Sequence, residues 1–182
     1  MDDLEALRQL LLRRSVRHGD FVLASGRKSS YYIDARLTTM SGEGQGLIGR
    51  AGLAAIRAAG WSPAAVGGLT MGADPVAYAV AAASVSTSAP IDAFSVRKEA
   101  KGHGTRRRIE GNFAPGMAVV VTEDVITSGG SALQAIHAVE EEGGLVLGVL
   151  AVVDREEGGR GTIEAAGHGV VVLATTTSLG LK

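Results

Sequence analysis

Residues 118–133, AVVVTEDVITSGGSAL, place hydroxyl groups and glycines between an apolar run and a helical pattern. In such a loop the small residues let backbone N–H groups converge, and the N-terminus of the following helix adds positive potential. The hydroxyls of Thr127, Ser128 and Ser131 add further hydrogen-bond donors. Segment 127–131 is therefore predicted to cradle a phosphate group.

Two neighbouring acids, Glu123 and Asp124, precede this loop. Because they repel a phosphate, they must serve another part of the same ligand. Carboxylates there can accept hydrogen bonds from the hydroxyls of a ribose ring, or Asp124 can help to hold hydrated Mg²⁺ through water. A phosphate cradle beside a diol acceptor predicts a ribose 5-phosphate site. The alternative is an ordinary helix N-cap by Ser or Thr, which needs neither two acids nor two glycines.

The apolar runs along the chain indicate the scaffold of this site. Five runs, mostly Val-rich and without polar alternation, are expected to be strands buried on both faces: 65–69, 91–96, 118–122, 145–153 and 170–174. Helical patterns are expected at 3–17, 44–60, 74–84, 130–142 and 161–167. The alternation predicts the α/β class, with a mostly parallel five-stranded sheet flanked by helices and a ligand site at the carboxyl ends of its strands.

The N-terminal third does not follow this alternation. Segment 21–36 is typical of two short strands around a Gly-Arg-Lys-Ser turn. It is expected to form a small N-terminal hood over the ligand edge. The chain is thus predicted to be a single domain, 1–182, with a hood and helices in 1–61 and a ligand-binding core in 62–182.

Composition excludes several other functions. The chain has 182 residues, 46% of them hydrophobic, which is enough for one domain with a sizeable core. Its net charge of −1 argues against a protein that coats nucleic acid. The absence of Cys excludes disulfides and a Cys nucleophile, and the four scattered His do not form a zinc pattern. Without a membrane-length apolar run or a signal pattern, a cytoplasmic protein with no membrane or nucleic-acid partner is expected.

Two familiar phosphate motifs do not explain the chain. No Walker A loop occurs, because no suitable loop ends in Gly-Lys-Ser/Thr. A G-x-G-x-x-G pattern occurs at Gly44, Gly46 and Gly49, but no buried strand leads into it and it lies within an expected helix. We interpret this pattern as a coincidence.

The segment TEDVITSGGS resembles the phosphoribosyl-diphosphate (PRPP) signature of type I phosphoribosyltransferases. Four further segments, FVLASGRKSSYYIDAR, GGLTMGADPVA, VRKEAKGHG and VVDREEGG, resemble the orotate phosphoribosyltransferase family in the same order, so the resemblance covers nearly the whole chain. It implies the type I phosphoribosyltransferase fold and a Mg²⁺-dependent transfer of ribose 5-phosphate from PRPP to N1 of orotate. The implied products are orotidine 5′-monophosphate and diphosphate, in de novo pyrimidine (UMP) biosynthesis.

The resemblance assigns PRPP to the cradle and to a basic loop, which closes over the active site of the partner subunit in a homodimer. The implied PRPP-binding residues are Glu123, Asp124, Val125, Ile126, Thr127, Ser128, Gly129, Gly130, Ser131, Arg97, Lys98, Lys101 and His103. The last four are also the implied catalytic residues.

The basic loop, 97–108, reads RKEAKGHGTRRR and holds six Lys or Arg against one acid, so its local charge is +5. Cations that reach a departing diphosphate stabilise the transition state more than the ground state, because the charge of the leaving group grows as its bond breaks. His103 is a candidate donor of a hydrogen bond or a proton to the departing oxygen. Arg106, Arg107 and Arg108 are expected to be hinge or surface charges. The alternative is a solvated loop or one that touches nucleic acid.

Arg155 follows the apolar run 145–153, so its guanidinium is expected at the ligand edge, where it can grip a planar carboxylate at two points. An ion pair with Asp154 or Glu156 is the alternative. Successive strand residues face opposite ways, so at most one of the two neighbouring tyrosines, 31 and 32, faces the ligand. The resemblance implies that the orotate-binding residues are Thr127, Arg155, Tyr32 and Lys28.

The chain departs from the family at two positions where some members carry a Lys. One is Gly72, in a second anion loop at 69–74, which would then bind diphosphate through backbone N–H groups. Asp74 is expected to cap the helix that follows this loop. The other position is Ala24, for which Lys28 is the candidate to compensate.

Two other functions stay open at this point. The cradle does not distinguish bases, so a phosphoribosyltransferase for uracil or a purine is the first alternative. The second is a PRPP-sensing regulator that binds nucleic acid on the same fold, although no helix-turn-helix extension is visible.

Overall fold

In a computed structural model, the chain is described for residues 2–22, 26, 28–99 and 108–182. The centre of the described part is a six-stranded sheet in the order β5-β4-β3-β6-β7-β8. Its strands are β3 (Ala65–Leu69), β4 (Asp92–Val96), β5 (Ile109–Gly111), β6 (Ala118–Ile126), β7 (Leu145–Asp154) and β8 (Val170–Thr175). The neighbours from β4 to β8 pair in parallel, whereas β5 pairs antiparallel with β4. The predicted α/β class and the five predicted strands are confirmed.

Two features of the sheet differ from the prediction. β5 adds a sixth strand, whose three residues are too few to show a sequence pattern. β6 continues to Ile126 because it keeps its parallel pairing with β7 as far as Asp154, four residues beyond the predicted end. Glu123 and Asp124 therefore lie within the paired part of β6, near its carboxyl end, and not after the strand.

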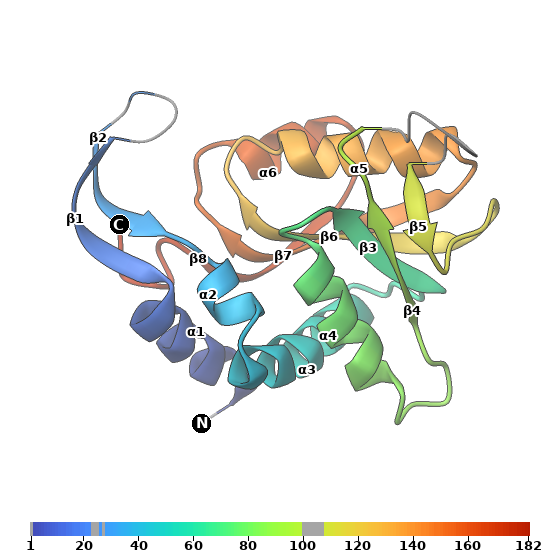
Figure 1. The fold of residues 1–182 in the computed structure, drawn as a ribbon, viewed down its shortest axis with the longest axis horizontal. Helices are drawn as coiled ribbons and strands as arrows, with labels where there is room; N and C mark the ends of the chain where they lie inside the picture. Colours follow the sequence, from blue (N-terminus) through green and yellow to red (C-terminus); the bar gives the residue numbers. More distant parts are fainter. Residues whose placement is uncertain (1, 23–25, 27, 100–107) are drawn as a thin grey trace.

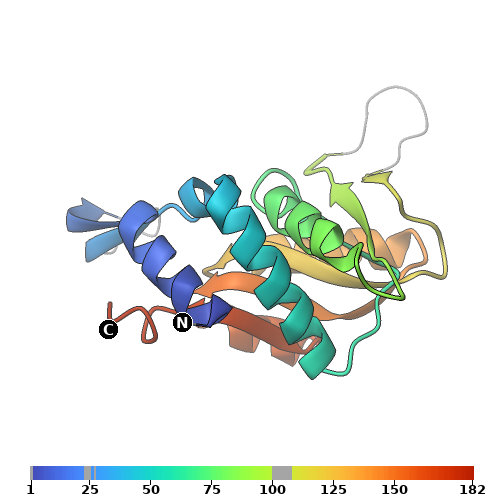
Figure 2. The same cartoon turned by 90° about the horizontal axis from the view of Figure 1, so that it is seen from below.

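Helices cover both faces of the sheet (Figure 1). α1 (Asp3–Arg14), α3 (Gly42–Ala58) and α4 (Asp74–Ser84) lie across one face, side by side in Figure 2. α5 (Gly130–Glu141) and α6 (Gly159–Ala165) lie on the other. Because side chains alternate along a strand, Val120 and Leu150 pack with the first group, and Val119, Val121 and Val149 pack with the second. Burial on both faces accounts for the absence of polar alternation in these strands.

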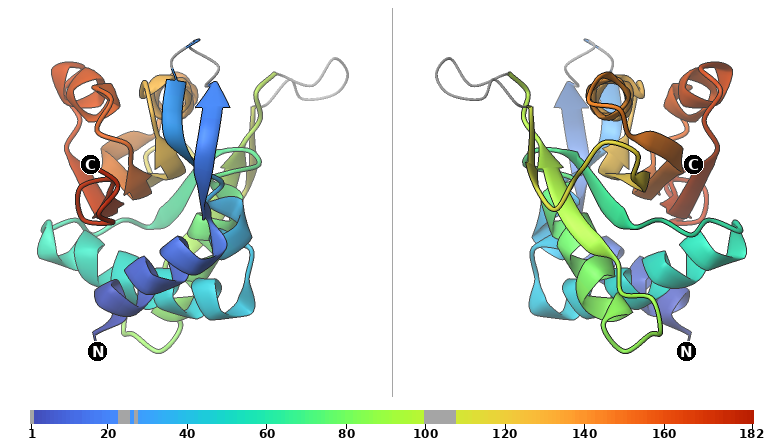
Figure 3. Two further views of the ribbon diagram at one scale, coloured as in Figure 1. Left: turned by 90° about the vertical axis from the view of Figure 1, so that its left-hand side faces the viewer. Right: turned by 90° about the vertical axis from the view of Figure 1, so that its right-hand side faces the viewer.

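The N-terminal part forms a separate antiparallel hairpin of β1 (Val16–Val22) and β2 (Lys28–Ile33), which projects at one end of the molecule (Figure 3). β1 begins earlier than predicted, because α1 ends at Arg14 and the Ser15 hydroxyl is buried against the hydroxyl of Thr38 at 2.7 Å. Thr38 belongs to α2 (Arg36–Thr39), a single turn that the sequence did not predict. The division into a hood and a core stays a prediction, although α1 and α3 share one hydrophobic cluster with the sheet.

The other helices match their predictions with small shifts. α3 begins and ends two residues earlier than predicted, because the Ser41 hydroxyl accepts from the Gly44 amide at 3.0 Å and caps the helix there. α6 is likewise shifted two residues toward the N-terminus. Asp74 is the first residue of α4 and not its cap, so that detail of the prediction was wrong.

The G-x-G-x-x-G pattern lies inside α3, as predicted, and packing explains two of its glycines. A Cβ at Gly44 would collide with the carbonyl oxygen of Thr38, and one at Gly49 with the carbonyl oxygen of Ala79 in α4. At Gly46 the nearest atom is Arg50 Nη1, at 3.4 Å, which belongs to a flexible side chain. Two glycines of this pattern are therefore required for close packing of α3, and the pattern does not indicate a nucleotide site.

Substituting these glycines should have opposite effects on stability. Gly49→Ala must push α3 away from the backbone of α4, so we expect a loss of about 1–3 kcal/mol in the free energy of unfolding. Gly46→Ala, at an exposed position of the same helix, should gain roughly 0.5–1 kcal/mol from helix propensity. Urea denaturation of both variants measures this contrast. Equal changes in the free energy of unfolding for the two variants would show that packing against α4 does not require glycine at position 49.

Candidate active site

The predicted cradle connects β6 to α5 at the carboxyl edge of the sheet. Gly129 has a φ of +84°, and a Cβ there would lie 2.7 Å from the carbonyl oxygen of Gly159, at the start of α6. The Gly159 amide donates to the carbonyl of Thr127 at 3.1 Å. The cradle thus needs glycine for its own backbone conformation and for its packing against α6, in addition to any need of a ligand. The side chains of Thr127, Ser128 and Ser131 are exposed and free to face a ligand.

The two acids before the cradle have different environments. Glu123 is 6% exposed, and burial, with a smaller contribution from Asp124, raises the pKa of its carboxyl to about 9. Asp124 is half-buried and accepts from the Val125 amide at 2.8 Å. Glu123 therefore holds a proton at neutral pH in the free protein, since a second buried charge beside Asp124 is unfavourable.

The second anion loop reaches the acids directly. A Cβ at Gly72 would lie 2.6 Å from Asp124 Oδ1, so a side chain at this position would require the Asp124 carboxyl group to shift. The loop is also tied to its neighbours: the Thr70 amide donates to the carbonyl of Val96 at 2.8 Å, and the Thr70 hydroxyl donates to Asp74 at 2.6 Å. The Thr70–Met71 peptide bond is cis.

A pocket of about 660 Å³ brings these parts together. Residues from the ends of β3, β4 and β6 and from the start of α2 line it: Arg36, Leu69, Thr70, Met71, Gly72, Lys98, Glu123, Asp124 and Ser131. The pocket therefore combines the acid pair, both anion loops and the first part of the basic loop. Its donors and acceptors suit a ligand with both hydroxyl and phosphate groups.

The basic loop is only partly described. Lys98 lines the pocket, and its carbonyl accepts from the side chain of Gln134 on α5 at 3.1 Å. Arg97 does not line the pocket, because its guanidinium pairs with Glu110 on β5 at 3.0 Å. Lys101 and His103, like Arg106 and Arg107, lie outside the described residues.

Arg155 lies at the end of β7, is 8% exposed and is fixed from several sides. Its amide donates to the carbonyl of Ile126 at 3.0 Å, and its guanidinium is 2.9 Å from Glu157. The alternative predicted an ion pair of Arg155 with Asp154 or Glu156; the structure shows an ion pair, but with Glu157. Glu156 instead accepts from the Thr176 hydroxyl at 2.6 Å and the Thr177 amide at 2.7 Å, and these bonds lower the pKa of its carboxyl.

The structure brings Tyr31, and not Tyr32, to this arginine. The guanidinium carbon of Arg155 lies 6.0 Å from the centre of the Tyr31 ring. Tyr32 faces the opposite way along β2, is 40% exposed and stacks beside Phe21, with ring centres 5.8 Å apart. The two tyrosines thus face opposite ways along β2, as strand alternation predicts, and the expectation that at most one of them faces the ligand stays a prediction.

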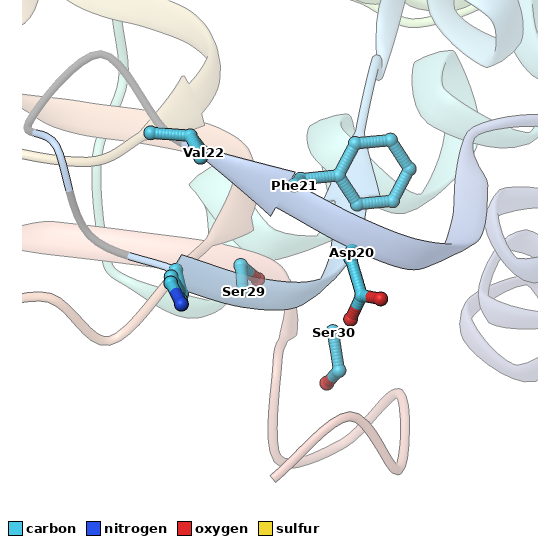
Figure 4. Close-up of a pocket in the computed structure, with 6 residues that line it drawn as sticks. Asp20, Phe21, Val22, Ser29 and Ser30 are labelled. Atoms are coloured by element: carbon cyan, nitrogen blue, oxygen red, sulfur yellow. The ribbon is translucent and has the colours of Figure 1, made fainter.

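Lys28 lies apart from the acid pair. It lines a second pocket of about 450 Å³ on the hairpin, together with Asp20, Phe21, Val22, Ser29 and Ser30 (Figure 4). Ala24, for which Lys28 was the candidate to compensate, lies outside the described residues. The role of Lys28 toward orotate stays a prediction.

Sequence reasoning missed Arg36 as a pocket residue. Arg36 reaches the pocket only because the one-turn helix α2 follows β2 directly, and a lone arginine after a strand gives no signal of that placement. Among the described residues, no group of three or more His, Cys, Asp or Glu is arranged to hold a metal ion. None of the helices in the described part is both long and apolar enough to cross a membrane.

Comparison with known proteins decides the family. No protein-family model matches the chain. The orotate phosphoribosyltransferase of Aquifex aeolicus is 50% identical over 170 residues, which is 92% of this chain and 92% of that protein. The crystal structure of Mycobacterium tuberculosis orotate phosphoribosyltransferase with Fe(III) dicitrate has 46% identity and a TM-score of 0.86, covering 98% of this chain and 99% of that one. The same enzyme in complex with PRPP has 42% identity and a TM-score of 0.82, over 98% and 99% of the two chains.

The chain belongs to the orotate phosphoribosyltransferase family. The type I phosphoribosyltransferase fold is thereby confirmed, as is enzymatic phosphoribosyl transfer to orotate in pyrimidine biosynthesis. The names of these relatives select orotate from the bases that the cradle alone left open.

The buried acid should give stability a definite pH dependence. Because the pKa of Glu123 rises on folding from 4.5 to about 9, the folded state binds the extra proton between these values, and its stability falls as pH rises through that window. Glu123→Gln removes this loss. The free energy of unfolding of the variant minus that of the wild type should therefore increase with pH, by at most about 1.4 kcal/mol per unit. Urea denaturation in metal-free buffer from pH 5 to 9 measures it, and a pH-independent difference would refute the buried proton.

Proposed function

We propose that the pocket is the PRPP site of this enzyme. The observation that carries this is the sharing of one pocket by the acid pair, the cradle residue Ser131 and the second anion loop. Segment 127–131 binds the 5-phosphate through backbone N–H groups and hydroxyls. Asp124 accepts from the ribose hydroxyls, and the 70–72 segment with Lys98 receives the diphosphate. The PRPP complex of the M. tuberculosis relative supports this assignment.

The reaction needs one bond made and one broken. N1 of orotate bonds to C1 of the ribose and gives up its proton, while the bond from C1 to the diphosphate oxygen breaks and its electron pair leaves with diphosphate. Positive charge grows on the ribose ring and negative charge grows on the leaving group. The protein therefore acts by holding the two reactants in line and by stabilising these charges, without a covalent nucleophile. Lys98, Lys101 and His103 are the proposed partners of the leaving group, and Arg97 is a further candidate if it exchanges its bond to Glu110.

The donor chemistry of the pocket fits Mg²⁺. Asp124 is half-buried and lines the pocket, and this ion takes only one or two carboxylates from proteins when substrate oxygens and water supply the rest. We propose that Asp124 holds it through water. When bound, Mg²⁺ neutralises charge on the oxygens of PRPP and so makes diphosphate a better leaving group.

The proposed orotate site lies between the cradle and the end of β7. Arg155 is buried, paired with Glu157 at 2.9 Å and close to the Tyr31 ring, so its side chain is held in place and its remaining N–H groups are the proposed donors to the orotate carboxylate. Thr127 lies beside it, since Ile126 accepts the Arg155 amide. Tyr32 and Lys28 remain candidates from the hairpin.

The function is tested by the fall in orotate absorbance with PRPP and Mg²⁺, which the purified chain should produce. Arg155→Ala should raise the KM for orotate about tenfold or more while leaving the KM for PRPP nearly unchanged, because the lost bonds are charge-assisted. The matched control is Arg160→Ala, which removes an exposed arginine paired with Glu164 on α6.

Each result has a clear reading. Turnover of uracil or a purine in place of orotate would overturn the substrate assignment. Lack of PRPP binding by calorimetry would overturn the pocket itself. A defect of Arg155→Ala confined to PRPP would move this residue out of the orotate site.

We also propose that the enzyme is a homodimer with shared active sites. Three exposed apolar side chains, Leu37, Met40 and Met71, are 43%, 49% and 61% exposed and line one groove of about 450 Å³. This groove shares Arg36 and Met71 with the PRPP pocket, so a second copy seated on it lies within reach of that pocket. A cytoplasmic location stays a prediction.

Mixing two inactive variants tests this sharing. Lys101→Ala disables the basic loop and Asp124→Asn disables the core of the site. If the loop serves the partner's site, each mixed dimer has one site with both residues intact, and random exchange should restore about a quarter of wild-type activity. Native mass spectrometry verifies that mixed dimers form. Their formation without any recovery would show that each loop serves its own subunit.

A further inference from the structure

Arg36 occupies a place in the pocket that the roles given above do not use. It is the first residue of α2, and it lines the pocket together with the 70–72 segment and Asp124. Of the residues lining the pocket in the described part of the chain, Arg36 and Lys98 are the two cations. They come from different elements, α2 and the end of β4, whereas the 70–72 segment contributes no charged side chain.

The guanidinium of Arg36 is held in one orientation by Asp34. Its Nε lies 2.8 Å from Asp34 Oδ1 and its Nη2 lies 3.0 Å from Oδ2, and the Arg36 amide also donates to Oδ1 at 3.2 Å. A guanidinium has five N–H donors, and this pairing uses two of them. The side chain is still 48% exposed, so three donors are left to face the pocket.

Arg36 is a stable cation at the edge of the pocket. Hydrogen bonding to Asp34 raises the pKa of Arg36, with smaller contributions from Asp124 and Tyr32, so Arg36 shares the field of the acid pair. Because Asp34 binds the Nε and Nη2 edge of the guanidinium and fixes its orientation, the Arg36 side chain loses little further conformational entropy when an anion binds.

We propose that Arg36 is a diphosphate-binding residue of this enzyme, positioned by Asp34 and acting opposite Lys98. This rests on the proposed PRPP pocket and extends it. Arg36 binds the leaving group from the side of the N-terminal hairpin. It supplies the positive charge that the backbone N–H groups of the 70–72 segment do not carry. Asp34 is a positioning residue, since it acts on the ligand only through Arg36.

The competing explanation is a purely structural pair that closes the turn from β2 into α2. The chain offers a matched control for it. Arg50 pairs with Asp3 in the same two-point manner, at 2.9 and 2.8 Å, and it lies on α3 outside the residues that line the pocket. Removing a surface pair of this kind without a ligand role should change binding very little.

The test is calorimetry of the full chain with Mg²⁺ and two separate probes, inorganic diphosphate and ribose 5-phosphate. Arg36→Gln should weaken diphosphate binding about tenfold and raise the KM for PRPP similarly. Ribose 5-phosphate binding and the KM for orotate should stay within about twofold. Asp34→Asn, which keeps the cation but loosens it, should show a smaller loss in the same direction, and Arg50→Gln should match the wild type.

The outcomes separate this inference from the proposed function. If the wild type binds PRPP and Arg36→Gln binds diphosphate as well as Arg50→Gln does, the inference is wrong and the PRPP pocket stands. Equal weakening of diphosphate and ribose 5-phosphate would also overturn it, because that pattern indicates a general distortion. A wild type that binds neither PRPP nor diphosphate would remove both proposals.

Discussion

The whole site depends on how closely other backbones approach the carboxyl end of β6. The contact of Gly129 with Gly159 leaves no room for a Cβ at either glycine, and Gly72 lies close enough to the Asp124 carboxyl group that a Cβ there would require this group to shift. Through these contacts the second anion loop, the acid pair, the cradle and the start of α6 are assembled around a single strand end. A side chain at Gly129 or Gly159 would push the cradle away from the start of α6.

This crowding also determines the charges of the site. A strand that is buried on both faces carries Glu123 into the interior, where burial raises the pKa of its carboxyl to about 9, while Asp124 on the opposite side of the strand is half-buried. Glu123 thus adds no negative charge to the pocket at neutral pH in the free protein. This favours the entry of a polyanion beside the cations Arg36 and Lys98.

Much of this was available from the sequence, because the strongest signals are local. The Val-rich runs placed the five parallel strands, and the succession of acids, hydroxyls and glycines placed the cradle. What escaped depends on tertiary contacts. The pairing of β6 with β7 beyond the acids and the one-turn helix α2, whose Thr38 meets Ser15, are decided by neighbours far away in sequence. The two tyrosines show the limit well: strand alternation predicts that they diverge, but only the packed structure shows which of them meets Arg155.

The hydrogen bonds at the end of β6 have one more consequence. The carbonyl of Ile126 holds the amide of Arg155, and the next carbonyl, Thr127, holds the amide of Gly159. In the proposed binding mode, the sugar phosphate and the base therefore both rest on these two peptide units. A ligand that stiffens this floor from one side leaves less conformational entropy to be lost on the other. We therefore expect the sugar phosphate and the base to be thermodynamically coupled, so that each binds more tightly when the other is already in place.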